Sequence, residues 1–178
     1  MGYKDELVRS MEWLAKKNDT VFIGQSVNYS GNAIFNTLKT VSEAKKIEVP
    51  VFEDLQMGLS TGMALEGYVP ITCYPRFDFL ILACNQLVNH LDKIDYMTKG
   101  AMKPRVIIRT SIGAKKPLDG GIQHTQDHTE AFRHLLSDID VVLLNESDEI
   151  FSAFKYAYER EDSKSTLIIE WGAFYNDK

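Results

Sequence analysis

The stretch VPVFEDLQMGLSTGMALEG, residues 49–67, joins two kinds of local structure at Glu53. The residues up to Glu53 are β-branched and strand-like. The residues after it are apolar and dotted with glycine, and they predict a buried helix that stops at Gly67. A buried charge is costly unless it is paired or protonated. Glu53 is therefore either an ordinary helix cap or a carboxyl group for which the fold has a use.

Strands and helices alternate on both sides of this stretch. Strands are predicted over 20–24, 48–53, 69–75, 105–111, 140–146 and 165–171, and helices over 4–18, 31–46 in part, 54–67, 77–100, 129–139 and 147–162, the last with Ser147 as its cap. This alternation, with continuous apolar strands such as RVIIR, predicts an α/β fold. We expect a single domain over residues 1–178, a three-layer sandwich with a mostly parallel central sheet.

Composition narrows the class of protein. The chain has 178 residues, a net charge of −5, 44% apolar and 25% charged residues, as a soluble globular protein does. It has no long basic run, which argues against a nucleic-acid partner, and no apolar run long enough to span a membrane. The N-terminus has no signal core, and Cys73 and Cys84 lie in predicted buried segments, which suits reduced thiols. We therefore expect a cytoplasmic protein.

Ligands of parallel α/β sheets bind at the carboxyl ends of the strands. Three segments meet that rule: GQSV after the first strand, Glu53 after the second, and TSIGAKKPLDGGIQH, residues 110–124, after the fourth. The glycine patterns GxGxxG, GxxxxGK[ST] and GxSxG are all absent. The sequence therefore does not resemble a self-sufficient nucleotide-binding enzyme or an α/β-hydrolase.

Two short motifs each allow two interpretations. HTQDH places His124 and His128 four residues apart, a spacing at which two histidines on one helix can bind zinc. Such a site also needs a third ligand, which the motif does not supply. A substrate contact or proton donor at the end of a glycine-rich loop is the favoured interpretation of His124, and no metal ligand is predicted. In RFDF, Phe77 and Phe79 are either core residues, which the pattern favours, or a stacking platform for a flat heterocycle.

These pieces together resemble one family. The segment PVFEDLQMGLSTGMALEG resembles the glutamate-containing segment of transketolase-type thiamine-diphosphate enzymes, and most of all the β subunits of the 2-oxoacid dehydrogenase decarboxylase component, such as pyruvate dehydrogenase. The resemblance continues through YPRFDF, NQLVNHLDKIDYMTKG, RVIIRTSIG, GGIQHTQDHTEAFRHLL and IDVVLLNESDEIFSAFKYA. It implies the pyrimidine-binding domain of that family, over almost the whole chain.

The resemblance implies a role for each candidate residue. Glu53 matches the catalytic glutamate that hydrogen-bonds a ring nitrogen of the cofactor's aminopyrimidine, and His124 matches a catalytic histidine facing the reacting centre. Phe79 matches the aromatic residue on the pyrimidine face, Phe77 lies beside it, and Val51 matches an apolar wall residue. Gln25 stands where relatives often carry an acid, and we assign it weakly to the same cofactor site.

The sequence also departs from the family pattern. Leu55 stands where a glycine is usual, although Gly58 and Gly62 keep their places as expected close-packing positions. The GDG motif that holds the diphosphate and Mg²⁺ is absent, so the resemblance implies a separate partner chain that binds both. Because the sequence ends soon after LIIEW, we expect no C-terminal domain of the β-subunit type. This expectation favours a stand-alone decarboxylase or carboligase pair over a dehydrogenase complex.

Three hypotheses follow. The first is the pyrimidine-binding subunit of a split enzyme, in a heterotetramer with two copies of each chain, acting on a small-molecule 2-oxoacid (decarboxylation or acyl transfer) or on a ketose (ketol transfer). The activity class would be oxidoreductase or transferase. The second is a catalytically inactive scaffold or regulatory relative. The third is a free-standing α/β binding protein that takes a different ligand without a partner.

Overall fold

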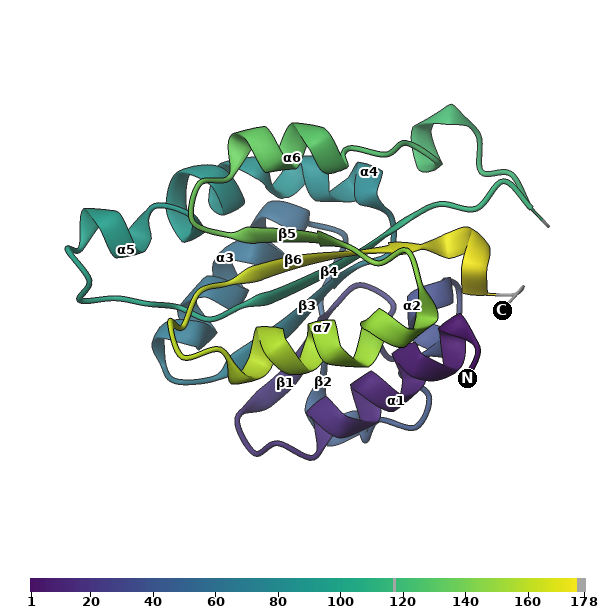
Figure 1. Ribbon diagram of the computed structural model, residues 1–178, viewed down its shortest axis with the longest axis horizontal. Coiled ribbons are helices and arrows are strands. Elements are labelled where there is room, and N and C mark those ends of the chain that lie inside the picture. Colours follow the sequence, from purple (N-terminus) through teal and green to yellow (C-terminus); the bar gives the residue numbers. More distant parts are fainter. Residues whose placement is uncertain (117, 176–178) are drawn as a thin grey trace.

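A parallel sheet forms the centre of the protein. The computed structural model describes residues 1–116 and 118–175, and within them the strand order is β2-β1-β3-β4-β6-β5, with every neighbouring pair parallel (Figure 1). The strands are β1 (Thr20–Gly24), β2 (Lys46–Glu48), β3 (Val69–Tyr74), β4 (Ile107–Ile112), β5 (Asp140–Leu143) and β6 (Thr166–Trp171). The prediction of a mostly parallel sheet is confirmed.

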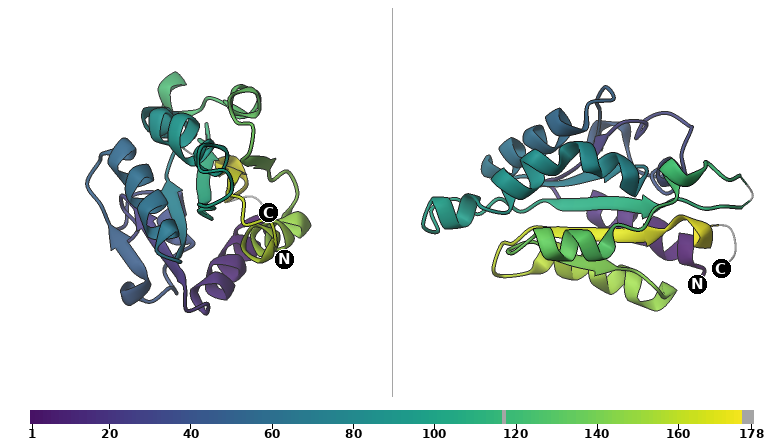
Figure 2. Two further views of the ribbon diagram at one scale, coloured as in Figure 1. Left: turned by 90° about the vertical axis from the view of Figure 1, so that its left-hand side faces the viewer. Right: turned by 90° about the horizontal axis from the view of Figure 1, so that it is seen from above.

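Helices cover both faces of the sheet. The α-helices are α1 (Tyr3–Ala15), α2 (Ala33–Asn36), α3 (Glu53–Leu65), α4 (Phe77–Leu80), α5 (Ile94–Met97), α6 (Thr129–Leu135) and α7 (Ser147–Glu159). Figure 1 shows α1 and α7 on one side of the sheet and α3, α4 and α6 on the other, and the view along the strands in Figure 2 shows the sheet between these layers. The predicted three-layer sandwich is therefore confirmed.

Alternating strand residues build two hydrophobic cores. In β4, Ile107 packs with the core under α1 and α7, whereas Ile108 packs with the core under α3 and α6. The same alternation places Ile168 of β6 in the first core and Leu167 in the second. Because all four side chains are fully buried, the sheet is covered on both faces, as a parallel sheet requires.

The second strand ends earlier than predicted. β2 stops at Glu48, and residues 49–52 connect it to α3, so Glu53 is the first residue of a helix and not the last of a strand. Pro50 explains the difference, because proline has no N–H with which to continue the ladder of hydrogen bonds. Val49 still donates its N–H to the Gly24 carbonyl, at 3.1 Å. The connection therefore leaves β1 only after that bond.

The long helix predicted over 77–100 is interrupted. It consists of α4, a 3₁₀ turn at Ile81–Ala83 (η2), a π-helical segment at Asn85–Leu91 (η3) and α5. The π segment ends with Asp92, whose N–H donates to the Leu87 carbonyl five residues back. A smaller difference concerns α7, where Glu146 and not Ser147 is the N-cap residue, and Glu149 accepts its N–H at 3.1 Å. The remaining short 3₁₀ segments are Glu43–Lys45 (η1), Ile122–His124 (η4) and Gly172–Tyr175 (η5).

A buried ion pair crosses the middle of the sheet. Arg109 of β4 and Glu170 of β6 are both 0% exposed, and Arg109 Nη2 lies 3.0 Å from Glu170 Oε2. Tyr175 donates its hydroxyl to the same carboxylate. Removing one member of such a pair would leave an uncompensated buried charge. The ion pair therefore ties β4, β6 and the C-terminal 3₁₀ turn together.

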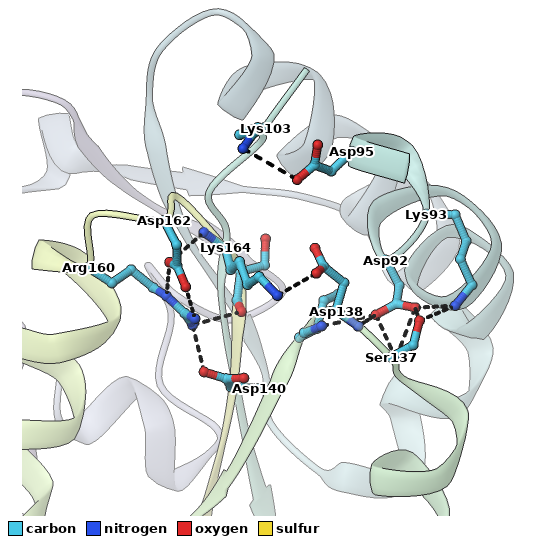
Figure 3. A network of polar contacts seen from close by, with 12 residues as sticks. Asp92, Lys93, Asp95, Lys103, Ser137, Asp138, Asp140, Arg160, Asp162 and Lys164 are labelled. Atoms are coloured by element: carbon cyan, nitrogen blue, oxygen red, sulfur yellow. Dashed lines mark hydrogen bonds and ion pairs between the residues drawn. The ribbon is translucent and has the colours of Figure 1, made fainter. Parts of the chain in front are cut away.

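A second polar network ties down the edge of the sheet where the strands begin, termed here the amino edge (Figure 3). Asp92 is 2% exposed, and its carboxylate accepts the backbone N–H groups of Ser137, Asp138 and Ile139 at 2.9–3.1 Å. Burial alone would raise the pKa of Asp92, but the hydrogen bonds from Lys93 and from these N–H groups outweigh it and lower the pKa below its usual value. Asp92 thus fixes the start of β5.

The start of β6 is held in the same way. Arg160 is 5% exposed and pairs with Asp140, at 2.9 Å, and with Asp162, at 2.6 Å. Lys164 pairs with Asp138 at 2.6 Å (Figure 3). The hydrogen bond from Arg160 lowers the pKa of Asp162 to about 2. At this edge, charges are used to join chain segments.

Candidate functional site

Glu53 lies at the opposite edge of the sheet, where the strands end, termed here the carboxyl edge. It is the first residue of α3 and is only 4% exposed. Its backbone carbonyl accepts a hydrogen bond from the Tyr74 hydroxyl at 3.2 Å. Gln25, directly after β1, donates its Nε2 hydrogen to Glu53 Oε1 at 2.9 Å. The positive end of the helix dipole also favours a carboxylate at this position. Glu53 is thus a nearly buried acid held by a neutral amide.

The loop that carries Gln25 is anchored by an acid that sequence reasoning missed. The carboxylate of Glu48, at the end of β2, accepts the backbone N–H groups of Ser26, Val27 and Asn28, the last two at 2.9 Å. Ser26 adopts a left-handed conformation, with φ of 55°, which turns successive N–H groups toward one carboxylate. Glu48 therefore sets the position of Gln25, and no sequence pattern indicated it because its partners lie on a different strand's loop.

Phe79 and His124 form the second pair of predicted site residues that the structure brings together. Their ring centroids are 5.6 Å apart and nearly perpendicular, at 89°. His124 Nδ1 lies 2.8 Å from the Gly120 carbonyl oxygen. Because a carbonyl can only accept, Nδ1 is the donor, and Nε2 of the neutral ring is left as an acceptor. Both rings are half-buried.

Glycines hold His124 against the sheet. An added Cβ at Gly113, directly after β4, would lie 1.8 Å from the His124 carbonyl oxygen, and one at Gly120 would lie 3.0 Å from His124 Cβ. Only residues without a side chain allow this approach of the 113–124 loop to its own start. The sequence analysis did not single out these two glycines, although both lie in its glycine-rich candidate loop.

Phe77 is placed differently from Phe79. It is 0% exposed and packs on Phe132, with ring centroids 5.1 Å apart, and edge-on against His128, at 5.4 Å. This is the core placement that the pattern favoured. Phe79 is therefore the ring of the RFDF motif that the fold leaves partly open.

The HTQDH motif does not lie on one helix. His124 ends η4 and His128 precedes α6, so the helical spacing needed for a shared zinc ion is not formed. His128 Nε2 instead lies 3.6 Å from Asp78 Oδ1. Across the part of the chain that the structure describes, no group of three or more His, Cys, Asp or Glu side chains is arranged to hold a metal ion.

Val51 lies on an exposed apolar surface and not on a wall inside the chain. It is 75% exposed. Exposed apolar side chains continue over the residue before α3, over α3 itself and over η2, which packs against α3; together with Val51 they are termed here the α3 surface: Phe52, Leu55, Leu59, Ile81 and Leu82. Gly62 shares a face with Leu55 and Leu59, and a Cβ there would meet no heavy atom of the described residues within 4 Å. The expectation that Gly62 is a close-packing position is therefore wrong within this chain, because its face is open.

Within residues 1–116 and 118–175, no helix is long and apolar enough to cross a bilayer.

Cys73 and Cys84 are free cysteines. Cys73 is fully buried in β3, and Cys84 is half-buried. Burial raises the pKa of the Cys73 thiol to about 12, so this thiol stays protonated at neutral pH.

The comparison with curated proteins finds pyruvate dehydrogenase subunits. The chain is 32% identical to the mitochondrial pyruvate dehydrogenase E1 component subunit beta of Saccharomyces cerevisiae over 119 residues, which are 65% of this chain and 32% of that protein. It is 30% identical to the corresponding subunit of Rickettsia conorii, over 67% of this chain and 37% of that protein. With the subunit of Gracilaria tenuistipitata the identity is 25%, over 98% of this chain and 54% of that protein. The chain thus spans about a third to a half of these relatives.

A solved structure and a family model complete the comparison. The structure, a split-gene transketolase in an inactive beta4 tetramer, matches with a TM-score of 0.62 and 16% identity, over 96% of this chain and 51% of that chain. At that identity it shows the fold alone. The family model described as "Transketolase, pyrimidine binding domain" matches residues 9–172. The chain therefore belongs to the transketolase pyrimidine-binding domain family, as its sequence indicated.

Proposed function

We propose that this chain is the pyrimidine-binding subunit of a split thiamine-diphosphate enzyme, active only with a separate chain that binds the diphosphate and Mg²⁺. The observation that carries the proposal is Glu53, a nearly buried acid at a helix start, directly beside the exposed α3 surface. Burying a carboxyl group is costly, and an exposed apolar surface beside it is typical of a contact with another chain. A partner seated on that surface would close the site over Glu53.

The residues present suit the aminopyrimidine ring of the cofactor. When bound, thiamine diphosphate supplies a nucleophilic carbon that adds to the carbonyl of a 2-oxoacid or ketose. Glu53 would hold or release a proton at a ring nitrogen, and Gln25 keeps its carboxyl group oriented. Phe79 would offer a flat apolar face, and His124 Nε2 would accept a proton from the substrate. Val51 would line the site only when a partner covers it.

The open face of α3 supports dependence on a partner. A Cβ added at Gly62 would meet no heavy atom of the described residues within 4 Å, so a second helix could approach the backbone there. The similar solved structure is described as inactive in its beta4 form, and the curated relatives are subunits of larger enzymes. We infer a heterotetramer with two copies of each chain, in a reducing, cytoplasmic compartment that suits the free cysteines Cys73 and Cys84.

Cofactor binding tests the proposal directly. Thiamine diphosphate and Mg²⁺ are titrated by calorimetry into the purified chain, alone and mixed with the candidate partner. We expect saturable heat only with the partner, and a loss of it with Glu53→Gln but not with Glu66→Gln, an exposed acid at the other end of α3. Binding in neither case would overturn the proposal and favour a non-catalytic scaffold. Tight binding of a different small molecule by the lone chain would favour a free-standing binding protein.

A further inference from the structure

His128, the second histidine of HTQDH, is not used by the proposed chemistry. It directly precedes α6, its side chain is 20% exposed, and its Nε2 atom is buried without a hydrogen-bond partner among the described residues. Asp78 of α4 lies opposite, with a side chain only 6% exposed and with Oδ2 likewise buried and unpartnered within residues 1–116 and 118–175. His128 Nε2 and Asp78 Oδ1 are 3.6 Å apart, within ion-pair distance. Two largely buried polar side chains therefore face each other beside the candidate site.

Asp78 also binds the loop between the two histidines of the motif. Its Oδ1 atom accepts a hydrogen bond from Gln126 Nε2 at 2.7 Å. Gln126 is exposed, so its amide could bond to water instead, and the main effect of this bond is to join two segments of the chain. Asp78, Gln126 and His128 are termed here the Asp78 latch.

The neighbouring charges leave Asp78 to these two partners. Among the described residues, His128 is the only group that forms an ion pair with Asp78. Asp127, the acid beside His128, is occupied, because its Oδ1 atom accepts the N–H and the hydroxyl hydrogen of Thr129 at 2.9 and 2.5 Å. An ionised carboxylate can only accept, so His128 presents a hydrogen on Nε2 to Asp78 whether its ring is neutral or charged.

Aromatic side chains fix both ends of the latch. Phe77, directly before Asp78, contacts the His128 ring edge-on, with centroids 5.4 Å apart, and packs on Phe132 of α6 with centroids 5.1 Å apart. Phe77 and Phe132 are 0% and 2% exposed. Because the packing already restricts Asp78 and His128, little side-chain entropy is lost when they hold the loop.

The Asp78 latch joins the two segments that carry Phe79 and His124. Asp78 directly precedes Phe79 in α4, and Gln126 follows His124 by two residues. The two rings make an edge-on contact with centroids 5.6 Å apart, which contributes little by itself. The loop before His124 is rich in glycine, so its backbone has many conformations to lose. The Asp78 latch adds the polar contacts that tie this loop to α4.

We propose that Asp78 is a positioning residue, which acts through Gln126 and His128 to keep His124 in contact with Phe79. The inference deepens the proposed function, on whose assignment of Phe79 and His124 to the cofactor site it rests. The contacts of the latch themselves do not depend on that assignment. Because Phe79 belongs to α4 and His124 to the loop, loss of the latch should displace His124 more than Phe79.

Nuclear magnetic resonance of the full-length chain, without cofactor or partner, tests the latch itself. In the wild type we expect nuclear Overhauser effects between the ring protons of Phe79 and His124, since these rings are in edge-on contact. Asp78→Ala removes the acceptor and should abolish these cross-peaks, whereas Asp78→Asn keeps an acceptor oxygen and should retain them. Gln126→Ala changes an exposed residue and should weaken them without disturbing the fold.

Glu130→Gln is the matched control for these variants. Glu130 lies on α6 close to the motif, its side chain is 74% exposed, and its ion pair is with Arg133, so the cross-peaks should not change. Cross-peaks of wild-type strength in a folded Asp78→Ala chain, or an equal change in Gln126→Ala and Glu130→Gln, would overturn the proposal. If Asp78→Ala does not fold, unchanged cross-peaks in Gln126→Ala would overturn it.

Activity of the pair reconstituted with the partner chain shows whether the latch positions His124 for the reaction. Asp78→Ala should lower kcat about tenfold, the equivalent of one hydrogen bond to a charged group. The affinity for thiamine diphosphate should change little, because Glu53 lies on α3, and Asp78→Asn should restore most of the turnover. A kcat of Asp78→Ala equal to that of an active wild type would overturn the positioning role. A wild-type pair without turnover would instead count against the proposed function, and the ring cross-peaks of the lone chain would then decide on the latch.

Discussion

The two edges of the sheet use charge in different ways. At the amino edge, Asp92 and Arg160 are buried, and their hydrogen bonds and ion pairs join segments that are distant in sequence (Figure 3). At the carboxyl edge, Glu53 is met by a neutral amide, and Lys4, Arg76 and Lys116 pair with no acid among the described residues. The difference indicates that the amino edge stabilises the fold, whereas at the carboxyl edge Glu53 and these three cations form no ion pair among the described residues.

The largest effect on stability is expected at Asp92. Asp92→Ala leaves the N–H groups of Ser137, Asp138 and Ile139 without their acceptor in a buried position. We expect the free energy of unfolding to fall by about 3 kcal/mol or more, measured by urea denaturation. Asp95→Asn is the control, since its partner Lys103 is 3.7 Å away and both side chains are part-exposed. An equal change in both variants would contradict the special role of Asp92.

The amino edge should also make the protein sensitive to acid. The pKa of Asp92 is lowered in the folded protein, so its contribution to stability is complete above the unfolded pKa of about 4 and is lost as pH falls through the lower, folded value. Urea denaturation at several pH values between about 5 and 2.5 should show the wild type losing stability. Asp92→Asn should lose less over that interval, and the same loss in both would refute this assignment.

At the carboxyl edge, Gly113→Ala should have an intermediate effect. The new Cβ would lie 1.8 Å from the His124 carbonyl oxygen, so the 122–124 turn must move. We expect a loss of about 1–3 kcal/mol in the free energy of unfolding, since overpacking forces the backbone to shift. The contact between Phe79 and His124 should be disturbed as well, which ring-proton chemical shifts would report. Unchanged shifts and stability would show that the loop is not clamped by this glycine.

Gly62→Ala should have the smallest effect on the isolated chain, and of the opposite sign. The residue lies within α3 and its Cβ would meet no heavy atom of residues 1–116 and 118–175 within 4 Å, so alanine should raise the free energy of unfolding by about 0.5–1 kcal/mol. If a partner helix approaches there, the same change should weaken association with the partner, measured by ultracentrifugation of the mixture. Unchanged association would remove Gly62 from the proposed interface.

The sequence predicted the layers of the fold because each relies on local patterns. Continuous β-branched runs such as TVFIG and TLIIEW became β1 and β6, and the amphipathic periods became α1 and α7. The end of β2 was misplaced because the β-branched residues around Pro50 outweighed the missing N–H of the proline. The break in the 77–100 helix was missed because apolar residues recur along the whole segment, and the π segment gives no local signal.

The candidate site was predicted in part. Gln25 and Glu53 are in contact, and so are Phe79 and His124, because each pair comes from segments that the parallel order brings to one edge. The Glu48 anchor and the approach of Gly113 to His124 were not predicted, because both depend on contacts between loops that no single segment encodes. The charges of Arg109 and Glu170, set in otherwise apolar strands, were a signal that could have revealed the buried ion pair.

Turnover of Glu53→Gln in the reconstituted pair tests the proposed role of this residue most directly. The 2-oxoacid or ketose reaction is measured with wild type, Glu53→Gln and the control Glu66→Gln, beside urea denaturation of each chain. Because the glutamine cannot exchange a proton with the cofactor ring, we predict a loss of turnover of about 100-fold or more at unchanged stability, and no loss in Glu66→Gln. Near-normal turnover by a folded Glu53→Gln chain would contradict the proposed role of Glu53.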